Sequence, residues 1–271
     1  MSDNLPVYEV YAIRYATREA RSSANFIGGD PHDVPMPLDY FVWVIKGPDQ
    51  PIVVDLGFTA ETAARLKREH LRCPIDSLPL IGVDPQSVRT AIVTHLHYDH
   101  VGNFHKLPNA EFHLQEAEIH YAVGRHMRYP FLNHGFNLDD IVGMVRLNYA
   151  ARVRFHNGPA QVAPGVTLHP VGGHSPGLQF VRVHTKRGWL VLASDATHFY
   201  ANMERSRPFP VIVSAPDMLE AYDRLIEAAP TPEHIVPGHD PLVMQLYPPA
   251  SPDLAGIVVR LDATPKPRRN V

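Results

Sequence analysis

Residues 95–100 of this chain of 271 residues read His95-Leu96-His97-Tyr98-Asp99-His100, and they are the strongest indication of its fold. It places four potential metal ligands within six positions. His95 and His97 stand two residues apart, which in an extended segment puts both side chains on one side. Asp99 and His100 then need a turn, most simply the first turn of a helix. The apolar segment 91–93 reads as a buried strand, so we expect a strand that ends in ligands.

The density of donors in this run indicates two metals. A catalytic metal usually takes three protein ligands and keeps an open position, so four donors exceed the need of one ion. Imidazole and carboxylate groups suit zinc, iron and manganese. Two-metal hydrolytic sites hold their ions about 3.5–4 Å apart. The alternative is a set of polar residues in a solvated loop, and the buried strand just before them argues against it.

The remaining ligands are expected from loops at other strand ends. His174 stands at the tip of a glycine-rich turn, Gly172-Gly173-His174-Ser175-Pro176-Gly177. Asp195 follows the apolar run 189–193, and His239 follows a last short strand in Pro237-Gly238-His239. Each signal is weak alone. Their order, and their common position after strands, make them strong together.

Composition narrows the class of protein. The chain is 45% hydrophobic and 20% charged, which is ordinary for a globular protein. A single cysteine, Cys73, excludes an internal disulfide and a thiolate-rich zinc site. The net charge of −3 argues against a nucleic-acid partner. Residues 1–4 lack a basic, apolar leader, and no apolar run approaches the roughly 20 residues of a membrane span. We therefore expect a soluble cytoplasmic protein.

The pattern along the chain predicts one α/β (α+β) domain over residues 1–271. Strands come in hairpin pairs with helices between them, which favours mixed sheets covered by helices over a doubly wound parallel sheet. We expect an edge strand at 7–14, a hairpin around residues 47–50, and a helix over 59–72. A helical insertion or cap is expected around 118–150, before the strands resume at 152–156.

These residues resemble the metallo-β-lactamase superfamily, whose pattern is HxHxDH followed by a distant His, an Asp and a final His. The resemblance spans Asp55 to His239 and implies a four-layer αβ/βα sandwich. It implies one metal on His95, His97 and His174, and a second on Asp99, His100 and His239. Asp195 would bridge the two ions. Asp55 matches the early aspartate that orients a metal-bound histidine.

Further residues indicate which family within the superfamily this chain resembles. Asp195 stands where the best-known zinc β-lactamases carry cysteine, and His100 where they carry Arg or Cys, so β-lactamase activity is not expected. Length, the early extended loop and the short spacing from Asp195 to His239 resemble the N-acyl homoserine lactonases. About thirty residues follow His239, which leaves little room for the C-terminal helical domain of glyoxalase II-type enzymes. No basic insertion of the tRNA-processing nucleases is seen.

The resemblance therefore implies a metal-dependent hydrolase of the quorum-quenching type. It would open an N-acyl homoserine lactone or another small lactone by attack of a hydroxide that bridges the metals. Asp99 would take the transferred proton. Two divalent ions are implied, zinc foremost, with iron, manganese or cobalt also open. The enzymatic alternative is a thioesterase or glyoxalase II-like ester hydrolase on the same site. A non-hydrolytic relative and a homodimer also remain open.

The substrate-contacting residues are the least determined. Homoserine lactonases carry a tyrosine three residues after the bridging aspartate, and here that position is His198. His198 would support the developing oxyanion. Tyr200 is the alternative if its loop bends inward. In the insertion, Tyr129, Phe131 and His134 could form an aromatic lid over the substrate, or could pack the cap onto the body.

Overall fold

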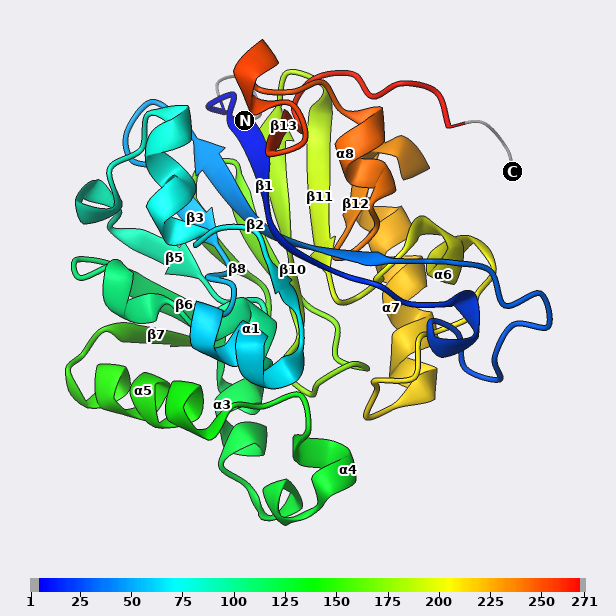
Figure 1. The fold of residues 1–271 in the computed structure, drawn as a ribbon. Coiled ribbons are helices and arrows are strands. Elements are labelled where there is room, and N and C mark those ends of the chain that lie inside the picture. Colours follow the sequence, from blue (N-terminus) through cyan, green and yellow to red (C-terminus); the bar gives the residue numbers. More distant parts are fainter. Residues whose placement is uncertain (1–4, 269–271) are drawn as a thin grey trace.

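Two β-sheets lie face to face, and helices cover their outer sides, giving four layers in the order αβ/βα (Figure 1). This computed structural model describes residues 5–268. Met1–Asn4, on which the expectation about a leader depends, and the tail residue Arg269 lie outside the described part. Within that part, no helix is both long and apolar enough to cross a membrane.

The first sheet has the order β13-β1-β2-β3-β5-β6-β7, with β4 paired to β1. Its strands are β1 (Glu9–Arg18), β2 (Leu38–Lys46), β3 (Ile52–Val54), β4 (Glu69–His70), β5 (Thr90–Ile92), β6 (Glu111–Gln115), β7 (Val153–His156) and β13 (Val258–Arg260). The second sheet has the order β12-β11-β10-β9-β8. Its strands are β8 (Ala160–Ala163), β9 (Val166–Pro170), β10 (Gln179–Thr185), β11 (Gly188–Ser194) and β12 (Ile235–Pro237).

Helices occupy the connections and the outer layers. The α-helices are α1 (Ala60–Leu66), α2 (Tyr98–Val101), α3 (Glu116–Ala122), α4 (Pro130–Asn133), α5 (Leu138–Tyr149), α6 (Tyr200–Glu204), α7 (Ala215–Ala228) and α8 (Leu242–Leu246). Short 3-10 helices span Ser22–Ala24, Ile75–Ile81, Pro85–Ser87, Phe104–Lys106, Arg125–Arg128, Pro232–His234 and Pro252–Leu254. α3, α4 and α5 form the predicted insertion between β6 and β7, which is confirmed.

Successive side chains of a strand point alternately into two different hydrophobic cores. On β2, Trp43 and Ile45 pack between the sheets, whereas Val42 and Val44 face the helices outside the first sheet. This is the two-residue period of a strand whose two faces are both buried. Trp43 is fully buried, and burying one large apolar side chain stabilises a fold by about 1.5–3 kcal/mol. The packed layers therefore form a rigid support for the loops at the strand ends.

The amphipathic helix α7 covers the outer face of the second sheet. Its buried residues Met218, Ala221 and Leu225 recur at helical spacing and pack in one cluster with Val191 of β11. Ser214 begins the helix, since its hydroxyl accepts a hydrogen bond from the Asp217 amide. The helix therefore forms the outer layer on this side of the sandwich.

Two expectations about individual elements are wrong. The strand predicted at 7–14 is not an edge strand, because β1 lies between β2 and β13. The sequence pattern gave no sign of β13, which comes from the far C-terminal part of the chain. The helix predicted over 59–72 ends at Leu66, because Lys67 adopts the left-handed conformation with φ of 54° and the chain turns into β4.

His113 of β6 gives the fold a dependence on pH. Its imidazole hydrogen-bonds that of His156 at 2.9 Å, and burial, with the neighbouring imidazole, lowers the pKa of His113 to about 4. The unfolded chain binds this proton near pH 6.5, so the free energy of unfolding falls as pH decreases from about 6.5 to 4. We expect His113→Gln to flatten this part of the profile, measured by urea unfolding of metal-free protein.

The exposed His105→Gln is the control for this measurement, because it removes an imidazole without breaking a buried contact. A profile of His113→Gln as steep as that of the parent protein would contradict the prediction.

Candidate metal centre

The ligand-bearing segments leave the two sheets at one end of the sandwich. His95 follows β5, and Asp195 and His239 follow the parallel strands β11 and β12. His174 stands in the turn between β9 and β10. Because parallel neighbours end at the same edge of a sheet, side chains that follow them meet there. The loops from both sheets therefore converge on one buried volume.

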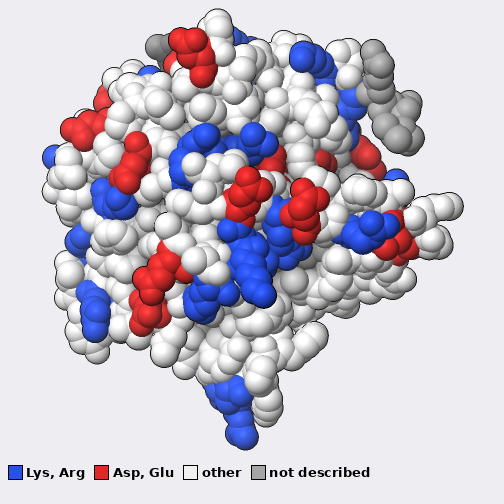
Figure 2. All heavy atoms as spheres, viewed as in Figure 1, with Lys and Arg blue, Asp and Glu red and all other residues white. Residues whose placement is uncertain are grey.

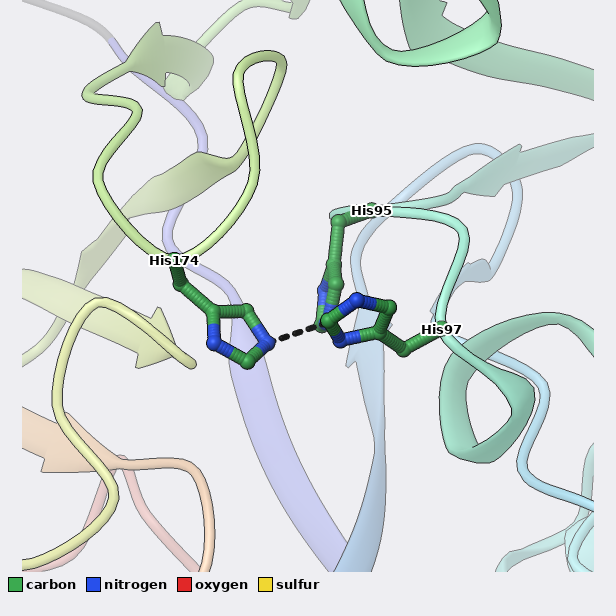
Figure 3. Close-up of side chains that lie close together, drawn as sticks. All are labelled: His95, His97 and His174. Atoms are coloured by element: carbon green, nitrogen blue, oxygen red, sulfur yellow. Dashed lines mark hydrogen bonds between the residues drawn. The ribbon is translucent and has the colours of Figure 1, made fainter. Parts of the chain in front are cut away.

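Three histidines form the first ligand cluster. One ring nitrogen from each of His95, His97 and His174 lies within 4.8 Å of those of the other two, and Figure 3 shows the three rings converging from two loops. The Nε2 atoms of His95 and His174 are 3.0 Å apart. Burial, together with the neighbouring imidazoles, holds the pKa of His95 and His97 well below its usual range. The rings are therefore neutral, which is the form that binds a metal.

The second cluster consists of Asp99, His100 and His239. Asp99 and His100 lie in the short helix α2 that begins directly after His97, as the spacing predicted. Asp99 Oδ2 is 3.6 Å from His100 Nε2 and 3.6 Å from His239 Nε2. All three side chains are buried. One carboxylate and two imidazoles thus form a second set of three donors beside the first.

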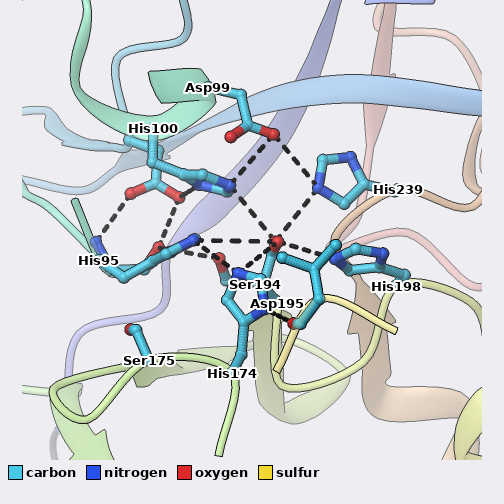
Figure 4. Close-up of polar contacts among 12 residues, drawn as sticks. His95, Asp99, His100, His174, Ser175, Ser194, Asp195, His198 and His239 are labelled. Carbon is cyan, nitrogen blue, oxygen red and sulfur yellow. Dashed lines mark hydrogen bonds and ion pairs between the residues drawn. The ribbon is translucent and has the colours of Figure 1, made fainter. Parts of the chain in front are cut away.

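Asp195 lies between the two clusters (Figure 4). Its Oδ2 is 3.3 Å from His174 Nε2 and 3.9 Å from His95 Nε2, in the first cluster. Its Oδ1 is 3.3 Å from His100 Nε2 and 3.2 Å from His239 Nε2, in the second. Each oxygen therefore faces a different cluster. This is the placement that a carboxylate shared by two cations requires.

Two unsatisfied atoms test whether cations fit this donor set. His100 Nε2 and Asp195 Oδ1 are buried and have no hydrogen-bond partner among the described residues. Buried polar atoms are nearly always paired, and both atoms carry lone pairs suited to a divalent ion. Desolvation opposes a charge on His100, yet the carboxylates of Asp55, Asp195 and Asp99 raise its pKa well above the usual range. The surroundings favour positive charge, and the donor set fits two divalent cations.

The outer nitrogens of the histidines are held by the protein. His100 Nδ1 is 2.7 Å from Asp55 Oδ2, and His239 Nδ1 donates to the Asp39 carbonyl at 2.9 Å. His174 Nδ1 donates to the Val211 carbonyl at 2.5 Å. A proton fixed on Nδ1 leaves the Nε2 lone pair free and directs it into the site. The ligands are therefore oriented by the fold itself.

A sequence model of the metallo-beta-lactamase superfamily matches residues 36–239. This chain belongs to the metallo-beta-lactamase superfamily. The superfamily resemblance and the four-layer fold expected from the sequence are both confirmed.

The curated relatives of this superfamily member include N-acyl homoserine lactonases. That of Bacillus thuringiensis is 30% identical over 138 residues, which are 50% of this chain and 49% of the relative. The lactonase AttM of Rhizobium johnstonii is 25% identical over 243 residues, 81% of this chain and 87% of the relative. The chain thus spans about half the length of the Bacillus relatives that it matches.

Solved structures share the fold. A quorum-quenching N-acyl homoserine lactone lactonase has a TM-score of 0.72 at 23% identity, over 87% of this chain and 93% of that one. AidC, a dizinc quorum-quenching lactonase, has a TM-score of 0.66 at 14% identity, over 88% of this chain and 89% of that one. The superfamily fold, its hydrolase relatives and the His/Asp site support a metal-dependent hydrolase with two metal ions.

The structure gathers the seven predicted ligands and Asp55 in one place. Asp55, at the end of β3, accepts hydrogen bonds from the Thr94 amide and hydroxyl, both at 2.8 Å. It has a φ of 62°, and Ser194, just before Asp195, has a φ of 46°. Non-glycine residues adopt this left-handed conformation rarely, and mostly where the surrounding structure imposes it at functional sites. Both strained residues lie beside the clusters.

His198 lies against the shared carboxylate. Its Nε2 is 2.8 Å from Asp195 Oδ2, and its ring stacks on Phe209 with centroids 3.3 Å apart. It also lines the cavity above the ligands. The position that carries tyrosine in homoserine lactonases is therefore directed into the site in this chain.

Tyr200 does not reach this site, which corrects the expectation that its loop bends inward. Its side chain is buried in the core between the sheets, under the Arg268 guanidinium, and does not line the cavity over the ligands. The reason is that Phe199 begins α6, and the Tyr200 amide donates to Asp240 Oδ2 at 3.1 Å, so the helix directs the tyrosine away.

Of the three insertion residues singled out, His134 lines the cavity over the ligands. Phe131 is 74% exposed and borders a small adjoining hollow, and Tyr129 is half exposed. The insertion contacts the site more directly through Gly135, where an added Cβ would lie 2.7 Å from His97 Nε2. The cap thus packs on a ligand, and an aromatic lid is supported for His134 alone.

Sequence reasoning missed Glu118, a fully buried carboxylate on α3. Its Oε1 accepts from the Leu96 amide at 3.0 Å, and its Oε2 accepts from the Ser175 hydroxyl at 2.8 Å and the Gly177 amide at 2.9 Å. Leu96 lies between two ligands, and Ser175 follows a third. One side chain therefore fixes both loops of the first cluster. Nothing in its sequence neighbourhood distinguishes it from a helix-surface glutamate.

Replacing single ligands should separate the two clusters. We expect His97→Ala and His239→Ala each to lower the bound metal from two equivalents to one or fewer, because each removes one of three donors. Asp195→Ala should lower occupancy of both sites, since each of its oxygens faces one cluster. Elemental analysis by mass spectrometry after desalting measures this. Two equivalents retained by His97→Ala would contradict the assignment.

Removing Glu118 should weaken metal binding without touching a ligand. We expect Glu118→Gln to lower metal affinity about 10- to 100-fold, the usual effect of losing a partner that supports a metal ligand. The amide can accept on one side only, so Leu96 or the Ser175 loop loses its partner. Competition with a chromogenic chelator measures the affinity. Glu116→Gln on the same helix is the matched control, and equal affinities of the two variants would refute the role.

Proposed function

We propose that this chain is a two-metal hydrolase that opens the ring of a small lactone, either an N-acyl homoserine lactone or a related compound. The observation that carries the proposal is the position of Asp195, with one oxygen facing each of two neighbouring ligand clusters. The lactone is supported by the curated relatives, which are N-acyl homoserine lactonases. Zinc is the proposed metal, with iron, manganese and cobalt as alternatives.

The cavity above the clusters provides the place for a substrate. It has a volume of about 160 Å³, and its lining includes the metal ligands His97, Asp99, His174, Asp195 and His239. When bound, divalent cations at such a site lower the pKa of water and polarise a carbonyl oxygen. A carbonyl group placed in this cavity meets the ligands of both clusters at once.

Ring opening adds one water across the acyl carbon–oxygen bond and gives a carboxylic acid and an alcohol. The oxygen that leaves the acyl carbon must gain a proton. We assign this transfer to Asp99, because its carboxylate lines the cavity and lies beside His100 and His239. A positioned carboxylate is a suitable proton carrier for such a step.

His198 orients the shared carboxylate and faces the substrate. Its 2.8 Å contact with Asp195 Oδ2 and its stacking on Phe209 restrict the ring to one position. From there it borders the cavity, and we assign it the support of the substrate oxygen that develops negative charge. No serine or cysteine nucleophile is needed. The predicted cytoplasmic location and the homodimer that the sequence leaves open stay predictions.

A substrate panel tests the reaction class. Metal-loaded protein is assayed with an N-acyl homoserine lactone, an unsubstituted γ-lactone, a thioester and a phosphodiester. We expect the best lactone to exceed the thioester and phosphodiester in kcat/KM at least about tenfold, because a carbonyl centre in a closed ring fits the compact cavity. Activity should disappear with a chelator and return with added zinc.

His97→Ala, purified in parallel, is the control for contaminating hydrolases. A higher kcat/KM for the thioester would replace the lactonase proposal by the thioesterase alternative, while the metal site would stand.

A further inference from the structure

Two arginines line the cavity together with the candidate metal ligands. Arg18 is the last residue of β1, and Arg68 follows α1 directly after the left-handed Lys67. Both line the cavity over the ligand clusters, and both also line an open groove beside it. The cavity and the groove therefore meet at these two side chains. A substrate in this cavity is therefore within reach of both the ligand clusters and the guanidinium groups.

Neither guanidinium forms a close ion pair with a described residue. Within residues 5–268, neither Arg18 nor Arg68 belongs to an ion pair. Arg18 Nε is buried and has no hydrogen-bond partner in that part of the chain. An unsatisfied buried donor costs free energy that a bound acceptor recovers. The protein thus holds a cationic donor at this place without supplying its acceptor.

Arg68 is held in position by hydrogen bonds from two of its three guanidinium nitrogens, and the third nitrogen remains free to bind a ligand. Its Nε donates to the Tyr98 hydroxyl at 3.2 Å, and its Nη1 donates to the Leu66 carbonyl at 3.0 Å. No hydrogen bond to a described residue uses its Nη2. A guanidinium presents several donors in a fixed plane, a geometry that matches the two oxygens of a carboxylate.

The cavity is lined by charges of both signs. Asp99 and Asp195 belong to the ligand clusters, where two cations fit, and Arg18 and Arg68 add two positive charges to the same lining. Beyond them, the groove is lined by charged side chains of both signs, Lys67, Glu19 and Glu69, together with alanines. Figure 2 shows basic and acidic side chains mixed over the face that carries β1 and α1.

The volume of the cavity over the ligands limits the size of the group that can bind there. Its volume of about 160 Å³ is below the roughly 300–1,000 Å³ of sites for drug-sized ligands. A five- or six-membered ring with one short substituent is the scale that it accommodates. The arginines then meet that substituent within a few bonds of the ring.

We propose that Arg18 and Arg68 bind a carboxylate on the substrate, so that the preferred substrate is a compact lactone bearing a carboxylate next to its ring oxygen. This inference rests on the proposed lactonase function and specifies its substrate class. In the reaction, the lactone carboxylate and one water give a hydroxy dicarboxylate and one proton. The carboxylate at the arginines does not react. It fixes the ring so that the scissile carbonyl lies over the clusters.

A matched pair of substrates tests the charge preference. The probes are 5-oxotetrahydrofuran-2-carboxylate and its neutral 2-carboxamide, which have the same ring and nearly the same size. We expect the metal-loaded protein to favour the carboxylate in kcat/KM by about tenfold or more. In the double variant Arg18→Gln, Arg68→Gln this ratio should fall about 10- to 100-fold, the usual effect of losing charge-assisted hydrogen bonds.

The ratio of kcat/KM for the two probes distinguishes loss of charge recognition from structural damage. Because Arg68 also holds Tyr98 beside Asp99, its loss can lower kcat for both probes, but such an effect cancels in the ratio. Arg65→Gln on the exposed side of α1 is the matched control, because it removes a nearby positive charge that does not line the cavity. Its ratio should equal that of the parent protein.

Binding gives a second readout that does not depend on turnover. Titration calorimetry with tetrahydrofuran-2-carboxylate, which has no scissile bond, should show weaker binding to the double variant than to the Arg65→Gln control. Hydrolysis of both probes with equal kcat/KM in all proteins would overturn the carboxylate site and leave the lactonase proposal standing. Failure of the metal-loaded parent protein to hydrolyse either probe or any lactone of the panel would overturn the proposed function itself.

Discussion

The carboxylate of Asp55 is the interaction on which the arrangement of the site depends. From the end of β3 it accepts two hydrogen bonds from Thr94 and contacts His100 Nδ1 at 2.7 Å. The Thr94 hydroxyl in turn lies 2.8 Å from the Ser194 hydroxyl, at the end of β11 in the other sheet. One buried network therefore connects the beginning of the ligand run, its last histidine and the segment before Asp195. Its strength comes from a charged acceptor in a region that excludes water.

Other buried hydrogen bonds also connect the two sheets and fix the distance between them. Gln179 of β10 donates to the Val93 carbonyl at 2.9 Å and accepts from Gln115 of β6 at 2.8 Å. Glu118 adds the connection between the loops of the first cluster. Since these polar groups are paired across the sandwich, moving one sheet against the other would leave several buried donors unsatisfied at once. The distance between the ligand clusters is thus set by the packing of the sheets and not by the loops alone.

The convergence of the seven candidate ligands could be predicted from sequence because their signals are local. Four of them lie in six residues, and the others follow short apolar strands, so the pattern reports both the chemistry and its place in the fold. Glu118, Arg18 and Arg68 could not be predicted in this way. They reach the site through tertiary packing, and each stands in a segment typical of a polar helix surface or strand end. The same reason explains the error at β1, whose partner β13 is distant in sequence.

The buried carboxylates of the donor set also link metal binding to the stability of the fold. His100, His174 and His239 are oriented by hydrogen bonds to their outer ring nitrogens before any cation binds. Yet Asp99 and Asp195 are buried carboxylates close together, and burying charge without compensation is costly. Bound cations remove that cost in the folded chain only, since the unfolded chain does not assemble the clusters. We therefore expect bound cations to raise the free energy of unfolding, with Asp195, which faces both clusters, as the shared contact.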